Sequence, residues 1–205
     1  MNTDLPKNAD QIRPALILVC GFARAGKDTL AEGIMDGAAG SIQKISFAEP
    51  LKASANQAIR DIIGPGVRFP GFGDEAFKVA NRALLVELGK TCRAIHQDCF
   101  VELALQQAAE NIALGNSVII TDVRYSNELS RCATWAELRG VPLYTLLIYT
   151  DGIEAANEEE RTNFDLLLIR SSTSSIGWTD RSRWKPDSAE HIKRHGQGLA
   201  SLMLI

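Results

Sequence analysis

A continuous apolar run, "ALILVC" (15–20), leads directly into the glycine-containing segment "GFARAGKDTL" (21–30). An uninterrupted apolar run of this length is typical of a strand that is buried on both faces of a parallel sheet. The residues from 26 to about 35 then carry apolar side chains at helical spacing, which predicts a helix. A buried strand that turns through glycines straight into a helix predicts an α/β fold with a parallel sheet.

The rest of the chain alternates in the same way. Further strands are expected at 41–47, 117–121, 142–149 and 164–170. Helices are expected at 49–63, 76–90, 98–114, 126–139 and 187–203. The serine-rich segment 171–184 is expected to be a loop. Because ligands of such sheets gather at the carboxyl ends of the strands, Gly21 and Asp122, each directly after an apolar run, are expected at the functional end.

Length and composition limit the class of protein. The 205 residues suffice for one buried core, so one domain is expected over 15–205, after a flexible lead-in over 1–14. The formal charge of −3 argues against a broad surface for duplex nucleic acid, although a local basic patch stays open. No apolar run approaches the roughly 20 residues that span a bilayer, so no membrane contact is expected. The four cysteines form no C-x-x-C pair, which favours reduced thiols and a cytoplasmic location.

The segment 21–29 matches the phosphate-loop pattern G-x-x-x-x-G-K-[ST] through Gly21, Gly26 and Lys27. Glycines let the backbone N–H groups converge on phosphate oxygens, and the lysine would reach the β- and γ-phosphates of ATP. The alternative is an ordinary strand-to-helix turn with a surface lysine. The candidate nucleotide-binding residues are Gly21, Arg24, Ala25, Gly26, Lys27, Asp28 and Thr29.

The loop departs from the pattern at its last position. Asp28 stands where a hydroxyl is expected, and Thr29 follows one residue late. A carboxylate near a triphosphate is repelled unless a metal ion lies between them, and Mg²⁺ prefers oxygen ligands. The candidate Mg²⁺ ligands are therefore Asp28, Thr29 and Asp122, and the sequence leaves open which of them binds the ion.

The stretch "VIITDVRYSNE" (118–128) supplies a second set of candidates. An apolar strand that ends in Asp122 is typical of the carboxylate that positions Mg²⁺ in phosphoryl-transfer sites. Arg124, two residues on, would bind a phosphate bidentately. Alternatively, the two residues form a structural ion pair. With Lys27 and Arg161, they make up the candidate catalytic set.

Candidates for the acceptor side follow the second strand and the central helices. In "FAEPLK" (47–52), Phe47 would line an acceptor pocket and Lys52 would meet an acceptor phosphate, although Phe47 suits the core equally well. In "GKTCRAIHQD" (89–98), the Arg93 guanidinium suits an acceptor phosphate. Asp98 is either a second acceptor contact or the cap of the next helix.

Together these motifs resemble the phage deoxynucleoside monophosphate kinase family, within the larger nucleoside-monophosphate-kinase-like group of P-loop proteins. The resemblance rests on "GFARAGKDT", "FAEPLK", "LGKTCRAIHQD" and "VIITDVRYSNE" and covers about residues 15–148. It implies a P-loop NTPase fold, ATP and Mg²⁺ as cofactors, and a G-K-D-T loop as an accepted variant. It carries over as acceptor-side or structural candidates Phe47, Lys52, Arg93, Asp98, Asp122, Arg124 and Glu128.

The last third departs from that family, whose members usually show an Arg-Pro-Gly element and later a His-x-Ser-Glu segment. This chain has "YTDGIEAANEEERTNF" instead, in which Arg161 is the candidate lid arginine. We therefore expect a lid over 151–163 and treat 164–205 as a divergent segment.

Three functions are compatible with these residues. The first is Mg²⁺- and ATP-dependent transfer of the γ-phosphoryl group to a deoxynucleoside monophosphate. The second, by resemblance to related phage kinases, is phosphorylation of 5-hydroxymethyluracil in DNA, for which the basic tail and its Trp178 and Trp184 provide a composition suited to bases and phosphates. The third is a non-catalytic, ATP-dependent nucleic-acid-binding module. The location would be the host cytoplasm if a phage encodes the chain, and a homodimer is one state that the composition leaves open.

Overall fold

Five parallel strands form one sheet in the computed structural model, which describes residues 13–155, 158–173, 178–185 and 188–203. In sheet order the strands are β2 (Ile42–Ile45), β3 (Ser117–Val123), β1 (Leu16–Cys20), β4 (Leu143–Thr150) and β5 (Trp178–Trp184). All five residues of β1 are buried, and Leu18 pairs with Ile120 on one side and Thr145 on the other. The α/β fold expected from the sequence, a parallel sheet flanked by helices with a glycine-containing loop between the first strand and the first helix, is confirmed.

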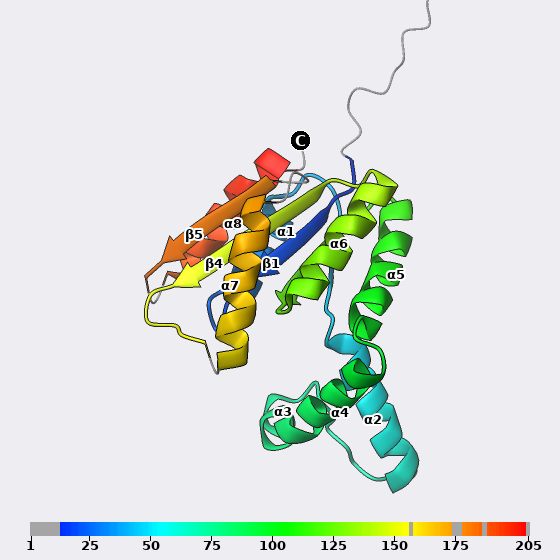
Figure 1. Cartoon of the computed structure of the whole chain (residues 1–205). Helices are drawn as coiled ribbons and strands as arrows, with labels where there is room; N and C mark the ends of the chain where they lie inside the picture. Colours follow the sequence, from blue (N-terminus) through cyan, green and yellow to red (C-terminus); the bar gives the residue numbers. More distant parts are fainter. Residues whose placement is uncertain (1–12, 156–157, 174–177, 186–187, 204–205) are drawn as a thin grey trace, which may run out of the picture.

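Helices cover both faces of this sheet (Figure 1). They are α1 (Lys27–Gly37), α2 (Glu49–Ile63), α3 (Glu75–Ala80), α4 (Arg82–Ile95), α5 (Cys99–Ala113), α6 (Ser126–Arg139), α7 (Glu158–Thr173) and α8 (Ala189–Met203). One core cluster joins the sheet to α5, α6 and α7. A second joins the opposite face to α1 and α8. The helices α2, α3 and α4, residues 49–95, project beyond the sheet, and we call them the arm.

The two helices on one face, α1 and α8, touch through their backbones. A Cβ atom added at Gly33 of α1 would lie 2.1 Å from the carbonyl oxygen of Lys193 in α8. Only a residue without a side chain allows this approach, so the glycine fixes how closely α8 packs behind the helix that follows the phosphate loop.

Two expectations for the last third were wrong. Residues 164–170, expected to be a strand, belong to α7. Phe164 and Leu167 face the core at 4% and 1% exposure, whereas Asp165 and Leu166 between them are exposed, which is a helical period.

The second error concerns 171–184, expected to be a loop. Its last seven residues form β5, which pairs with β4 from Tyr144↔Trp178 to Thr150↔Trp184. β5 is the edge of the sheet and has a strand on one side only, so it does not require the continuous apolar run by which the central strands are identified. The predicted lead-in 1–14 lies almost wholly outside the described residues. None of the described helices combines the length and the hydropathy needed to span a membrane.

Candidate functional site

The phosphate loop connects the carboxyl end of β1 to the first turn of α1. Gly26, the residue before the helix, has φ 89°, and Arg24 has φ 67°, so the backbone turns through two left-handed positions. The hydroxyl of Thr150, at the end of β4, donates to the carbonyl of Ala25 at 3.0 Å. The loop is thereby attached to two neighbouring strand ends, β1 through the chain and β4 through Thr150.

Lys27 folds back across this loop. Its ammonium donates to the carbonyls of Gly21 at 2.9 Å and Phe22 at 2.8 Å. Burial lowers the pKa of Lys27, and the nearby positive charge of Arg124 lowers it further. Lys27 and Arg124, two of the four predicted catalytic residues, therefore lie close enough for their charges to interact.

A carboxylate already contacts the loop. The amide of Ala23 donates to Oε1 of Glu160, in the first turn of α7, at 3.2 Å. One turn later Phe164 packs against Phe22 and Tyr149, with ring centroids 4.7 and 5.1 Å apart. The Ala23 amide therefore donates to an anionic oxygen, as it would to a phosphate oxygen. Phosphate binding at this loop stays a prediction.

Asp28 is held by two donors. Lys44 of β2 donates to Oδ1 at 2.6 Å, and the hydroxyl of Thr121 in β3 donates to the same oxygen at 3.0 Å. Burial acts to raise the pKa of Asp28, but the hydrogen bonds from Lys44 and Thr121 outweigh it and lower the pKa. Asp28 is therefore ionised at neutral pH, and its Oδ2 receives no hydrogen bond from the described residues. Thr29, the next residue of α1, is partly buried. Carboxylate and hydroxyl oxygens are ligands that Mg²⁺ prefers, so Mg²⁺ binding by Asp28 and Thr29 stays a prediction.

Asp122, the other predicted metal ligand, closes the turn between β2 and α2. Its carboxylate accepts hydrogen bonds from the Ser46 hydroxyl at 2.7 Å and from the amides of Phe47 and Ala48 at 3.0 Å each. These three bonds hold the start of the arm to the end of β3. No cluster of three or more metal-ligating side chains occurs within the described ranges. A metal-positioning role for Asp122 stays a prediction.

Glu128 lies under the segment that carries Arg124. It is 4% exposed and accepts the amides of Arg124 at 2.8 Å and Tyr125 at 3.0 Å. Burial raises its pKa to about 7, against the lowering effect of those two hydrogen bonds. Both hydrogen bonds go to the backbone of the turn, so in this structure Glu128 braces the start of α6.

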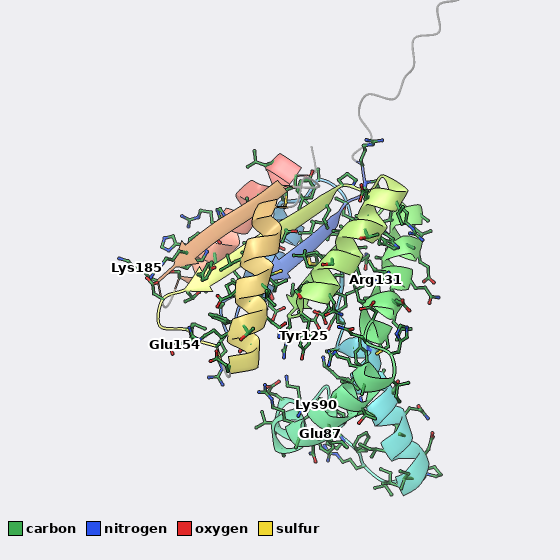
Figure 2. All side chains as sticks on the ribbon, viewed as in Figure 1. Glu87, Lys90, Tyr125, Arg131, Glu154 and Lys185 are labelled. Atoms are coloured by element: carbon green, nitrogen blue, oxygen red, sulfur yellow. The ribbon has the colours of Figure 1, made fainter. Side chains whose placement is uncertain are left out.

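Arg93, near the end of α4, lies between two aromatic rings. Its guanidinium carbon is 4.9 Å from the ring centre of Phe100 and 4.8 Å from that of Tyr125. One of its nitrogens lies 4.0 Å from Glu128 Oε1. Such contacts orient a guanidinium and leave its nitrogens able to bind a planar anion. Figure 2 shows Tyr125 on the body of the molecule, with Glu87 and Lys90 on the arm.

The remaining acceptor-side candidates have partners of their own. Phe47 is 2% exposed in the core, which is the packing alternative left open by the sequence. Lys52 pairs with Glu49 at 3.1 Å on the same helix. Asp98 precedes α5 but makes no capping hydrogen bond, and it accepts instead from Asn127 at 2.9 Å.

The candidate lid divides into a turn at 151–155 and the first turns of α7, while 156–157 lie outside the described residues. Arg161, half exposed, is 4.0 Å from Glu154. Lid closure and the role of Arg161 as a lid arginine stay predictions.

Sequence reasoning missed Lys44, Thr121 and Glu160. The first two belong to strands and reach the loop only because β2, β3 and β1 are neighbours, which no local motif reveals. Glu160 follows two other glutamates in "EEER", and a run of glutamates is typical of the exposed first turn of a helix. Nothing in this pattern indicates a contact with the loop.

The basic tail is partly engaged within the chain. Arg183 pairs with Asp151 at 2.6 Å, and Lys193 pairs with Asp36 at 2.8 Å. Trp184 packs against the second core cluster, with its ring 5.2 Å from that of His195. The side chain of Trp178 lies outside the description. The structure therefore shows Trp184 packed on the body of the protein.

Comparisons with known proteins give similarity in shape only. No family model matches the sequence, and no curated protein is detectably similar to it. A putative kinase from Chloroflexus aurantiacus has a TM-score of 0.46 at 12% identity, over 93% of this chain and 94% of that one. An APS kinase from Mycobacterium tuberculosis, in complex with AMPPNP and APS, has 0.43 at 13%, over 94% and 98%. A sugar kinase from Janibacter sp. has 0.41 at 12%, over 90% and 93%. At these values the similarities assign no activity.

Proposed function

We propose that this protein is an ATP-dependent phosphotransferase that moves the γ-phosphoryl group of ATP to a deoxynucleoside monophosphate. The observation that carries the proposal is the phosphate loop itself: Lys27 lies across it and an anionic oxygen of Glu160 already occupies one of its amides. Catalysis of phosphoryl transfer depends mainly on positioning and charge neutralisation, and this site is built from groups that do both.

On the donor side, the amides of residues 21–29 would hold the phosphates, with the dipole of α1 behind them. Lys27 and Arg124 would neutralise charge on the phosphoryl group in transfer. Asp28 and Thr29 would hold Mg²⁺, which when bound neutralises the β- and γ-phosphates and fixes their orientation. Arg161 would contribute a further positive charge from the start of α7.

On the acceptor side, Arg93 supports a phosphate-bearing acceptor. Its guanidinium is oriented by Phe100 and Tyr125, and the same turn carries Arg124. An arginine held in this way presents paired N–H donors to the two oxygens of a phosphate. A monophosphate bound there would be approached from the loop side by the γ-phosphate of ATP, so the two arginines would reduce the repulsion between the two anions.

The second candidate, 5-hydroxymethyluracil in DNA, rests on the composition of the tail. Arg183 and Lys193 form ion pairs within the chain, and Trp184 packs on the core. The described part of the tail therefore has fewer unpaired positive charges and exposed aromatic rings with which to bind DNA. We therefore favour the free nucleotide. Lys27 at the loop and Asp122 at the end of β3 make a non-catalytic module the least favoured of the three.

Transfer of label from γ-labelled ATP tests the proposal. Label in a deoxynucleoside diphosphate is expected when the four deoxynucleoside monophosphates are offered. Label in hydroxymethyluracil-containing DNA would support the second candidate, and no label in any acceptor would favour the third. Lys27→Ala is expected to abolish transfer, with Lys78→Ala on the arm as the control that keeps it.

A further inference from the structure

Lys44 is a lysine beside the phosphate loop that the proposed chemistry leaves without a role. It lies on β2 and extends its ammonium to Asp28 Oδ1 at 2.6 Å, with side-chain exposures of 37% and 70%. Thr121, from β3, donates to the same oxygen. Side chains from two strands, β2 and β3, thus contact the one residue at which the loop departs from its usual pattern.

The carboxylate at this position creates an electrostatic problem for a phosphate ligand. Asp28 directly follows Lys27 in the first turn of α1, at the positive end of the helix where the phosphates would bind. A negative charge there repels the phosphates and competes with them for the helix dipole. The side chain of Asp28 is 70% exposed, and one like-charge contact at such a site changes affinity by at most about tenfold, which a neighbouring cation can offset.

We propose that Lys44 is a positioning residue of the nucleotide site, whose ammonium cancels the charge of Asp28 and, with Thr121, fixes the orientation of its carboxylate. This inference rests on the proposed nucleotide-binding function. Because both contacts fall on Oδ1, the second oxygen, Oδ2, is the one that Asp28 retains for Mg²⁺. Lys44 and Asp28 then work as a pair that replaces the hydroxyl of an ordinary phosphate loop.

A purely structural ion pair makes different predictions. Exposed pairs contribute little to folding stability, and their removal has no reason to affect a ligand. If Lys44 acts through Asp28, however, removing Lys44 weakens nucleotide binding only while the Asp28 carboxylate is present. The loss of affinity is also smaller when Mg²⁺ is bound, because Mg²⁺ then cancels the charge of Asp28 instead. Both dependences can be measured by binding alone.

The experiment measures the Kd of ADP by calorimetry, first without Mg²⁺ and then at increasing MgCl₂. Lys44→Met is expected to weaken Mg²⁺-free binding about tenfold, and the deficit is expected to shrink as Mg²⁺ rises. The double variant Asp28→Ser with Lys44→Met is expected to return to within about threefold of wild type. Lys44→Arg, which keeps the charge, should bind like wild type.

Lys193→Met is the matched control. Lys193 also pairs with a carboxylate of α1, Asp36, and its side chain is 39% exposed, but the contact lies at the other end of the helix. It should leave the Kd unchanged. Melting curves establish that each variant is folded at the temperature of the titration.

The outcomes separate this inference from the function on which it rests. If wild type binds ADP and Lys44→Met binds it equally well, or if the double variant stays as weak as the single one, the inference is overturned and the proposed function stands. If wild type binds neither ADP nor ATP, both fall. A Lys44→Arg variant as weak as Lys44→Met would also overturn it, because charge would not be what matters.

Discussion

Replacing Glu128 by Gln should stabilise the protein at alkaline pH and leave it almost unchanged in acid. The carboxylate is 4% exposed, and its pKa is raised by burial from 4.5 to about 7. The folded protein therefore holds this proton more tightly than the unfolded chain does. Stability due to this group is fully present below pH 4.5 and is lost as the pH rises through about 7.

The magnitude follows from the two pKa values. Their difference, at about 1.36 kcal/mol per pKa unit, corresponds to about 3 kcal/mol of lost stability at pH 8. A glutamine keeps an oxygen that accepts the amides of Arg124 and Tyr125 but cannot ionise. We expect Glu128→Gln to raise the melting temperature at pH 8 by about 6–12 °C relative to wild type, and by little at pH 5.

The assay is thermal unfolding of wild type and variant at pH 5, 6, 7 and 8. Glu137→Gln makes the same chemical change at an exposed position of the same helix and serves as the control. Equal pH profiles for wild type and Glu128→Gln would refute the reasoning, since they would mean that the carboxylate is ionised without cost where it is buried.

Three further predictions concern the loop, the acceptor side and the packing behind the sheet. Glu160→Gln should tighten the binding of a non-hydrolysable ATP analogue several-fold more than the binding of ADP. The reason is that the substitution removes a negative charge at the Ala23 amide of the loop. Equal changes in the two Kd values would argue against this placement. Arg93→Lys should raise the KM for the acceptor by about tenfold and leave the KM for ATP unchanged. Lysine can neither stack on the rings of Phe100 and Tyr125 as a planar group nor donate two parallel hydrogen bonds. If steady-state kinetics show both KM values rising together, the prediction is wrong. Gly33→Ala should lower stability by about 2 kcal/mol or more, because its methyl group would overlap the backbone of α8; urea unfolding with an unchanged midpoint would contradict it.

The central part of the fold could be predicted because its signals are local. The apolar run before Gly21 identifies β1, and the helix predicted over 126–139 has those bounds in the structure. Two signals failed in the last third. Residues 164–170 were predicted as a strand although Phe164 and Leu167 lie one helical turn apart, and β5 has no apolar run because it is an edge.

The backbone of the loop was predictable, and the surroundings of the loop were less so. The pattern around Lys27 predicts which residues would contact a phosphate, because backbone and side chain are set by adjacent positions. Asp28, in α1, accepts hydrogen bonds from residues of two strands, β2 and β3. The Asp122 carboxylate accepts hydrogen bonds from the turn that begins at Ser46. Neither fact is contained in a motif, since both depend on which strands are neighbours in the sheet.

The packing of α8 against α1 has a consequence for synthesis of the chain. The second core cluster is made from residues 15–42 together with 192–203 and the strands between them. A nascent polypeptide on the ribosome therefore exposes the apolar residues of α1 until residues 192–203 have been translated. Chaperones should bind the chain mainly in that interval, and a stop codon before α8 would leave these apolar residues uncovered.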